Sequence, residues 1–276
     1  MYKISIITVN YNDVQGLEKT ISSVMNQTSL DFEYIVIDGG SDDGSLEIIK
    51  KYKGNINYFI SEKDSGIYNA MNKGIKVATG DYLFFLNSGD HFFNRDVIKK
   101  YSGYLQQEDL VYFNIEIKNN NFSKIVSYPN IFRFSDFYIG GICHQSVFIK
   151  KTLFEEIGLY DEDLKIVSDW KFFILALFKY NCSYKKVDET LSTYYLGGLS
   201  SKINNFEERN SVIREHFKGF FQDYEEYLTN RNLVNTNRFR MLREIEKSII
   251  GTKLVSVFFR FYVALFTKTK LKDLLN

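Results

Sequence analysis

The sequence has few cysteines and almost no net charge. Its two cysteines, Cys143 and Cys182, are too few among 276 residues for a disulfide framework, so we expect a protein of the reducing cytoplasm. The 35 lysines and arginines nearly balance the 34 aspartates and glutamates, which argues against a dedicated nucleic-acid binder. The first residues, MYKISIITVNYN, lack a charged leader and a small-residue cleavage site, so we expect no secretory signal.

A long uninterrupted apolar run is also missing. Lys253 and Arg260 interrupt the apolar stretch that ends in LVSVFFRFYVALF, so we expect it to fall short of a membrane span. Residues 238–276 contain nine basic side chains against three acidic ones, a net charge of +6. A basic, aromatic-rich amphipathic helix is typical of contact with a membrane surface, and packing on the domain or in a homodimer is the alternative.

Apolar residues make up 45% of the chain, enough for a sizeable core. The pattern alternates between apolar strand-like runs and helical periodicities, which favours a parallel sheet covered on both faces. We therefore expect an α/β domain over residues 1–205 and a helical extension over 206–276. The expected strands are 4–9, 33–38, 57–61, 82–86, 109–117, 144–150 and, near an edge of the sheet, 181–189. The expected helices include 67–78, 151–158 and 168–180.

Polar residues follow each of the first four predicted strands. They are Asn10 to Asp13, Asp38, Asp64, and Asn87 to Asp90. Any one of these groups is typical of a turn, but four at the carboxyl edge of one parallel sheet predict a ligand site. A nucleotide diphosphate fits, because a carboxylate such as Asp90 can hold a hard divalent ion against phosphate oxygens. Asp38 could accept hydrogen bonds from a base or sugar.

Four longer segments carry a family resemblance. SIITVNYN, YIVIDGGSDDGS, SEKDSGIYNAMNKGIKVATGDYLFFLNSGD and GGICHQSVFIKKTLFEEIGLYDEDLKIVSDWKF resemble, in order and spacing, family 2 inverting glycosyltransferases of the GT-A fold. The resemblance covers about residues 3 to 200. FLNSGD followed by CHQSVF is similar to the subgroup that builds bacterial exopolysaccharide, capsule or lipopolysaccharide.

The resemblance implies a fold, a reaction and partners. The fold is a Rossmann-like, mostly parallel sheet flanked by helices. The reaction moves a sugar from a nucleotide-sugar donor, usually UDP-linked, to a hydroxyl of a lipid-linked or oligosaccharide acceptor, with Mn²⁺ or Mg²⁺ as cofactor. Such an enzyme is expected in the cytoplasm, peripherally on the inner face of the cell membrane.

The resemblance also assigns roles to residues. Asp90 matches the acid that binds the metal, whereas Asn87 and Gly89 depart from the Asp-x-Asp pattern and carry no charge. Asp169 matches the catalytic base, which takes the proton from the acceptor hydroxyl. His144 and Gln145, in CHQ, match the position of donor or diphosphate contacts. The residues that match the nucleotide pocket are Thr8, Asn10, Tyr11, Asp38, Asp64, Lys73, Asn87, Ser88 and Gly89.

Several residues also permit a structural interpretation. Asp169 could cap the helix 168–180, and this is compatible with a catalytic role. Trp170 could stack on a sugar ring or pack inside a helix interface. His144 could be an interior histidine whose two nitrogens are satisfied by hydrogen bonds. The loop 194–202 could form a flap over the donor or a linker.

The sequence leaves two alternatives to a glycosyltransferase. The uncharged residues Asn87 and Gly89 raise the alternative of a catalytically degenerate nucleotide-sugar-binding subunit. A sugar-phosphate nucleotidyltransferase is the other alternative. It would be expected to carry a glycine-rich phosphate loop after the first strand, and TVNYNDVQG does not provide one.

Overall fold

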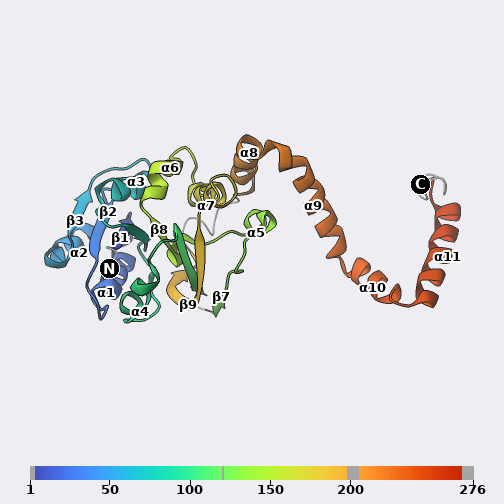
Figure 1. Cartoon of the computed structure of the whole chain (residues 1–276), viewed down its shortest axis with the longest axis horizontal. Helices are drawn as coiled ribbons and strands as arrows, with labels where there is room; N and C mark the ends of the chain where they lie inside the picture. Colours follow the sequence, from blue (N-terminus) through green and yellow to red (C-terminus); the bar gives the residue numbers. More distant parts are fainter. Residues whose placement is uncertain (1–3, 120, 198–204, 269–276) are drawn as a thin grey trace. The chain divides into compact units, whose positions relative to one another are not determined.

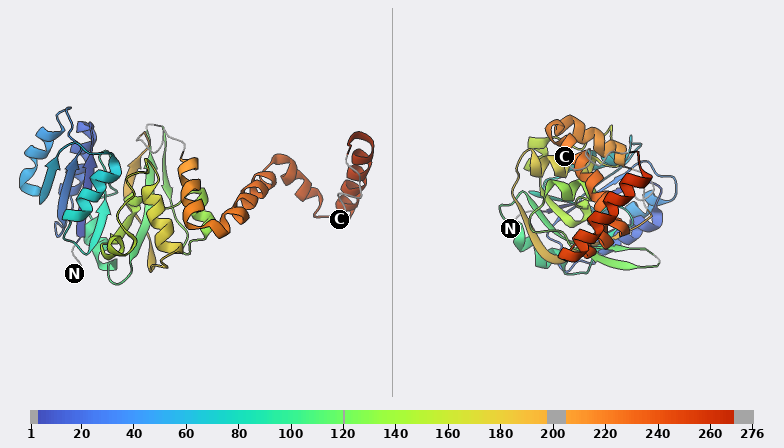
Figure 2. Two further views of the ribbon diagram at one scale, coloured as in Figure 1. Left: turned by 90° about the horizontal axis from the view of Figure 1, so that it is seen from above. Right: turned by 90° about the vertical axis from the view of Figure 1, so that its right-hand side faces the viewer.

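The computed structural model describes residues 4–119, 121–197 and 205–268 (Figure 1). The chain forms two units, Met1–His216 and Phe217–Asn276. The first unit contains the sheet, and its helices lie on both sides of the strands (Figures 1 and 2). Nine strands of the described residues form one sheet, with β7 paired to β6 beside the main order β3-β2-β1-β4-β8-β6-β9-β5.

The first half of the sheet is parallel, as the alternation of strands and helices predicts. Strands β1, β2, β3 and β4 all run in one direction, and helices connect them. The strands are β1 (Ile4–Asn10), β2 (Glu33–Asp38), β3 (Tyr58–Ser61) and β4 (Tyr82–Phe85). The helices are α1 (Val14–Met25), α2 (Ser45–Lys51) and α3 (Ile67–Val77).

The second half of the sheet is mixed. Strand β8 pairs antiparallel with β4, and β6 then pairs antiparallel with β8 and parallel with β9. Its strands are β5 (His91–Phe92), β6 (Leu110–Lys118), β7 (Ser123–Val126), β8 (Val147–Lys150) and β9 (Tyr184–Tyr195). Its helices are α4 (Val97–Tyr101), α5 (Phe134–Ile139), the 3-10 turn η3 (His144–Ser146), α6 (Thr152–Ile157) and α7 (Ser168–Phe178). Strand β9 is longer than the predicted strand 181–189.

Alternate residues of the central strands face opposite layers of helices. Ile6 and Val36 lie in one apolar cluster with Leu17 of α1. Their neighbours Ile7 and Ile37 face α3, where Gly74 allows the helix to approach the sheet closely. Both faces of β1, β2 and β4 are therefore covered, and almost all of their residues are buried.

The boundary between the units lies later than the predicted boundary at residue 205. Helix α8 (Phe206–His216) belongs to the first unit, where Val212 and Ile213 are buried and the Tyr138 hydroxyl donates to Asn210 Oδ1 (3.0 Å). The second unit contains α9 (Phe221–Val234), α10 (Asn237–Ile245) and α11 (Ile249–Phe266). Of the predicted flap 194–202, residues 198–202 lie outside the described residues.

Helix α11 corrects one prediction. It continues through Lys253 and Arg260 for 18 residues, with a mean hydropathy of 1.7. It is therefore long and apolar enough to cross a membrane, contrary to the expectation that the charges make the run too short. The reason is that the helix begins at Ile249, before the first of the two charges.

The close contact at Gly74 gives a test of the packing. A Cβ at this position would lie 2.5 Å from Ile7 Cγ2. We expect Gly74→Ala to lower the free energy of unfolding by about 1–2 kcal/mol, because overpacking outweighs the better helix propensity of alanine. Urea unfolding followed by fluorescence of Trp170, the only tryptophan, measures the first unit.

The matched control is Gly103→Ala, since a Cβ at Gly103 would meet no atom within 4 Å. Unchanged or increased stability of Gly74→Ala would show that α3 does not approach β1 this closely.

Candidate active site at the carboxyl ends of the strands

The polar ends of the parallel strands lie side by side. In the sheet register Asn10 pairs with Asp38, and Asp38 pairs with Ser61. The Ser88 amide donates to Val9 O (3.0 Å), which brings the turn after β4 to the same edge. The predicted grouping of these polar residues is therefore confirmed, at the edge where α/β sheets bind ligands.

Asp38 connects several residues of this edge through hydrogen bonds. Its buried carboxylate accepts hydrogen bonds from Asn10 Nδ2 (2.7 Å), Ser61 Oγ (2.6 Å), Ser41 Oγ (2.6 Å) and Ser41 N (3.0 Å). Burial alone would raise the pKa of Asp38, but these donors together hold it below its ordinary value. Its hydrogen-bonding capacity is used within the protein, and its direct contact with a base stays a prediction.

Two further residues predicted to bind the nucleotide have structural roles. The fully buried Thr8 donates to Leu86 O (2.8 Å) and lies 3.0 Å from the Tyr34 hydroxyl, so it joins β1 to its neighbours. Lys73 forms an ion pair with Glu62 (2.8 Å) rather than extending freely. The short threonine side chain points into the sheet, and the lysine is neutralised locally.

The part of the edge that solvent reaches is formed by the exposed Tyr11 and the half-buried Asp64. The Tyr11 ring is 67% exposed. A Cβ on Gly39 would lie 2.6 Å from Asp64 Oδ2 and 3.1 Å from Tyr11 Cδ2, so both side chains flank this glycine. Burial raises the pKa of Asp64, although Gly66 N donates to its Oδ1 (3.0 Å). An aromatic ring and a carboxylate thus border one open surface.

The segment Asn87 to Asp90 forms a tight turn, as predicted from its composition. Asp90 N donates to Asn87 O (3.0 Å), and Gly89 adopts a φ of +93°, in the left-handed region that favours glycine. The Thr20 hydroxyl of α1 donates to Asp90 O (2.6 Å) and so ties the turn to the first helix.

A second carboxylate borders the same turn. Asp13 Oδ2 accepts a hydrogen bond from Ser88 Oγ (3.0 Å), and it lies 3.6 Å from the position of a Cβ on Gly89. Asp13 is also the N-cap of α1, where Oδ1 accepts from Gly16 N (3.0 Å). The sequence placed Asp13 among the polar strand ends without giving it a role, although its capping position was a usable signal.

Asp90 is the acid of the turn and is almost completely buried. Its Oδ2 accepts from Gln145 Nε2 (2.9 Å), and its Oδ1 accepts from Tyr195 N (3.2 Å). Burial raises its pKa to about 6 despite these donors. The neighbouring Asn87 Oδ1 is buried without a hydrogen-bond partner. Both groups would be stabilised by a cation.

The turn fits a divalent metal only when other ligands complete the site. Asp90 retains lone pairs beyond its two hydrogen bonds, and the Asn87 oxygen is unsatisfied. Within the part of the chain that the structure describes, no group of three or more His, Cys, Asp or Glu residues could hold a metal by itself. Mg²⁺ or Mn²⁺ would therefore depend on phosphate oxygens and water, which is how such ions commonly bind.

Asp169 lies in the first turn of α7 and accepts from three donors. His144 Nδ1 is 2.7 Å from its Oδ2, while the Tyr68 hydroxyl (3.0 Å) and Trp170 N (2.9 Å) donate to its Oδ1. Burial alone would raise the pKa of Asp169, but His144 and the other donors hold it below its ordinary value. The N-cap of α7 is Val167, so the capping interpretation of Asp169 is wrong.

The turn η3 connects the two acids. His144 contacts Asp169, and the next residue, Gln145, contacts Asp90. An ionised Asp169 can only accept, so His144 Nδ1 carries the hydrogen of this bond. His144 Nε2, 3.2 Å from Asn87 Nδ2, is then the acceptor of that amide. The structure therefore brings together Asn87, Asp90 and Asp169.

Trp170 is a packing residue. It is 4% exposed, and its Nε1 donates to Phe137 O (2.7 Å). The Arg209 guanidinium lies over the ring, 4.9 Å from its centre. The interpretation of Trp170 as a sugar-stacking residue is therefore contradicted. Tyr68, by contrast, was missed, although it occupies the first turn of the helix that follows the polar segment at Asp64.

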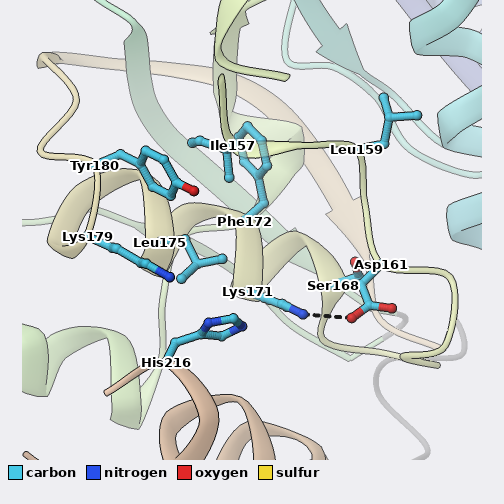
Figure 3. A pocket seen from close by; sticks show the side chains of 10 residues that line it. All are labelled: Ile157, Leu159, Asp161, Ser168, Lys171, Phe172, Leu175, Lys179, Tyr180 and His216. Carbon is cyan, nitrogen blue, oxygen red and sulfur yellow. Dashed lines mark hydrogen bonds and ion pairs between the residues drawn. The ribbon is translucent and has the colours of Figure 1, made fainter. Parts of the chain in front are cut away.

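A separate cavity of about 190 Å³ lies beside another face of α7 (Figure 3). It is lined by apolar side chains together with Ser168, Lys179, His216 and the ion pair of Lys171 with Asp161 (2.7 Å). None of the predicted site residues lines it. The hydrogen-bonded polar and acidic side chains described above lie near the carboxyl ends of the strands, so we place the active site there.

The fold and this edge define an α/β protein with a ligand site at the carboxyl ends of its parallel strands. Residues 5–158 match the model of the family described as glycosyl transferase family 2. The chain belongs to this family, and it is a glycosyltransferase with a GT-A fold. This assignment removes the support for a sugar-phosphate nucleotidyltransferase.

Three known proteins illustrate the relationship. The PGL/p-HBAD biosynthesis glycosyltransferase of Mycobacterium bovis is 30% identical over 211 residues, which are 74% of this chain and 80% of that protein. The Staphylococcus aureus poly(ribitol-phosphate) beta-N-acetylglucosaminyltransferase TarP is 37% identical over 134 residues, 46% of this chain and 41% of that protein. The solved structure of S. aureus TarS 1-349 with UDP-GlcNAc is similar in fold, with a TM-score of 0.63 at 17% identity over 98% of this chain and 77% of that chain.

The contact between His144 and Asp169 predicts a change in pH dependence. Removing the histidine in His144→Ala removes a hydrogen-bond donor to Asp169, so the pKa of Asp169 should rise. The measurement is the NMR titration of the Asp169 carboxyl carbon, which we expect to move to higher pH in His144→Ala. Donor turnover would not isolate this change, because Asp90, with a pKa of about 6, titrates at higher pH than Asp169.

His216→Ala is the control, because this histidine lines the separate cavity and does not contact Asp169. A titration of the Asp169 carboxyl that is identical in wild type and His144→Ala would contradict the proposed influence of His144 on Asp169.

Proposed function

We propose that the protein is an inverting, metal-dependent glycosyltransferase of bacterial cell-surface polysaccharide synthesis. It would transfer a sugar from a UDP-linked donor to a hydroxyl of a lipid-linked or oligosaccharide acceptor. The observation that carries this proposal is the pair of acids held by η3, since Asp90 has a raised pKa and Asp169 a lowered one. Two carboxyl groups whose pKa values are shifted in opposite directions are suited to two different roles, here a metal ligand and a base.

The donor nucleotide is assigned to the exposed part of the strand edge. Tyr11 offers a ring face for a base, and Asp64 offers an acceptor for base or ribose hydrogen-bond donors. The likeness in fold to TarS, solved with UDP-GlcNAc, supports a uridine nucleotide. Asp38 would act indirectly, by holding the loop at Ser41 in place.

The diphosphate is assigned to the turn after β4. Asp90 and the unsatisfied Asn87 oxygen would hold a divalent ion there, and such an ion would neutralise the charge that develops on the leaving diphosphate. Gln145 holds the Asp90 carboxylate in one orientation. Its raised pKa means that metal affinity should weaken below about pH 6.

Asp169 is assigned as the base. The acceptor oxygen attacks the anomeric carbon as the bond to the diphosphate breaks, and Asp169 takes the hydroxyl proton. His144 and Tyr68 hold the carboxylate ionised and oriented. A single displacement inverts the anomeric centre, and the beta linkage in the name of TarP supports this stereochemistry. The free cysteines Cys143 and Cys182 support a cytoplasmic location.

A binding subunit without turnover is the second candidate. It is favoured by the uncharged Asn87 and Gly89 in the metal-binding turn. A screen of donor hydrolysis across UDP-, GDP- and dTDP-sugars separates the two functions. Metal-enhanced binding with turnover supports the enzyme, whereas nucleotide binding without turnover of any donor supports the subunit.

Replacement of the base gives a direct prediction. Asp169→Asn should reduce transfer by about 10²- to 10⁴-fold, because the amide cannot take the acceptor proton. UDP binding measured by calorimetry should change little, since Asp169 is not assigned to the nucleotide. The control is the exposed Asp163→Asn, which makes the same chemical change outside the site. Wild-type turnover in Asp169→Asn would exclude the assigned base.

The metal ligands can be ranked in the same way. Asp90→Asn should abolish the enhancement of UDP binding by Mn²⁺ in calorimetry, because the only carboxylate of the Asn87–Asp90 turn is lost. Asn87→Ala should weaken the enhancement by a smaller factor, since a neutral oxygen contributes less to a hard cation. Equal losses in the two variants would identify Asn87 as an equal ligand, and no loss in Asp90→Asn would exclude metal binding at this turn.

A further inference from the structure

Helix α11 exposes apolar side chains over most of its surface. Gly251 is its one buried residue. Its exposed large apolar side chains have between 48% and 78% of their surface accessible. They are Ile249, Ile250, Leu254, Val257, Phe258, Phe259, Phe261, Tyr262, Leu265 and Phe266. We expect a partner to cover this much exposed apolar side-chain surface.

The charges of α11 lie on one side of the helix. Lys253 and Arg260 are seven residues apart, so they point in directions that differ by about 20°. Ser256, three residues after Lys253, lies on the same side. Apart from Thr252, which borders this side, the remaining circumference is apolar and includes Leu254, Phe258, Phe261, Tyr262 and Leu265. The helix therefore has a narrow polar stripe and a broad apolar face.

We propose that α11 binds the surface of an anionic lipid bilayer and lies in the plane of the membrane. Lys253 and Arg260 would remain among the headgroups, while the apolar face enters the acyl region. This proposal does not depend on the chemistry proposed for the active site.

The placement of the charges favours this orientation over a span. The 18 residues give a helix of about 27 Å, close to the thickness of the hydrocarbon core of about 30 Å, so length alone does not separate the two orientations. A spanning helix would carry Arg260 well inside the hydrocarbon, where an isolated charge is strongly unfavourable. With the helix in the membrane plane, both charges reach water and phosphate.

The positive net charge around α11 favours an anionic membrane. Residues 238–276 carry nine basic side chains against three acidic ones, which complements an anionic lipid surface. A second copy of the chain is a weaker candidate, because helix pairing buries a narrow seam and would leave much of the broad apolar face in water.

Cosedimentation of the full chain with vesicles tests the proposal. The vesicles contain phosphatidylcholine alone or mixed with anionic phosphatidylglycerol. We expect binding to the anionic vesicles that weakens with salt, and release of the protein by alkaline carbonate. Lys253→Gln/Arg260→Gln should weaken binding about thirtyfold, from about fivefold for each cation near the surface. Donor hydrolysis without lipid should be unchanged, which shows an intact active site.

Lys99→Gln/Lys100→Gln on α4 removes the same charge elsewhere and should bind lipid as the wild type does. Equal affinity for neutral and anionic vesicles would overturn the electrostatic part of the proposal. Retention after carbonate treatment would identify a spanning helix. A dimer in analytical ultracentrifugation that binds no vesicles would identify a second copy as the partner and overturn the membrane proposal.

Discussion

The active site depends on a single short turn that holds two carboxylates at once. His144 binds Asp169 and Gln145 binds Asp90, so the turn η3 fixes the distance between an acid near the first helix and an acid on α7. The pKa values of these two acids are shifted in opposite directions. Asp90 is buried with few donors and its pKa is raised to about 6, whereas the donors around Asp169 hold its pKa below the ordinary value. The proposed diphosphate site and the proposed base can therefore coexist at one edge of the sheet.

The parallel half of the sheet makes this arrangement possible. The in-register ends of β1, β2 and β3 place Asn10, Asp38 and Ser61 in one row. Within this row, Asp38 accepts hydrogen bonds from both Asn10 and Ser61. The residues left for a ligand are those beyond the row, such as Tyr11 and Asp64. The edge thus consists of a buried polar layer that gives rigidity and an exposed layer that is available for recognition.

Much of this could be predicted from the sequence, because strand ends and their polar residues follow from local patterns. Motif order led to the proposed roles of Asp90 and Asp169, and the alternation of apolar runs predicted the parallel sheet. Local patterns did not distinguish the fully buried Asp38 from the half-buried Asp64, since the burial of a side chain depends on segments that are distant in sequence. Tyr68 was missed, and the two interpretations of Trp170 stayed open, for the same reason: their partners, Asp169 and Phe137, are distant in sequence. The 18-residue length of α11 depended on where the helix begins rather than on the charges inside it.

The central claim is a single displacement with Asp169 as the base, and the configuration of the product tests it most directly. The protein is incubated with an α-linked UDP-sugar that it turns over and an acceptor alcohol, and the anomeric proton of the product is observed by NMR. A β-linked product is predicted, because one attack opposite the leaving diphosphate inverts the centre. An α-linked product would contradict the account, since retention requires a different role for Asp169.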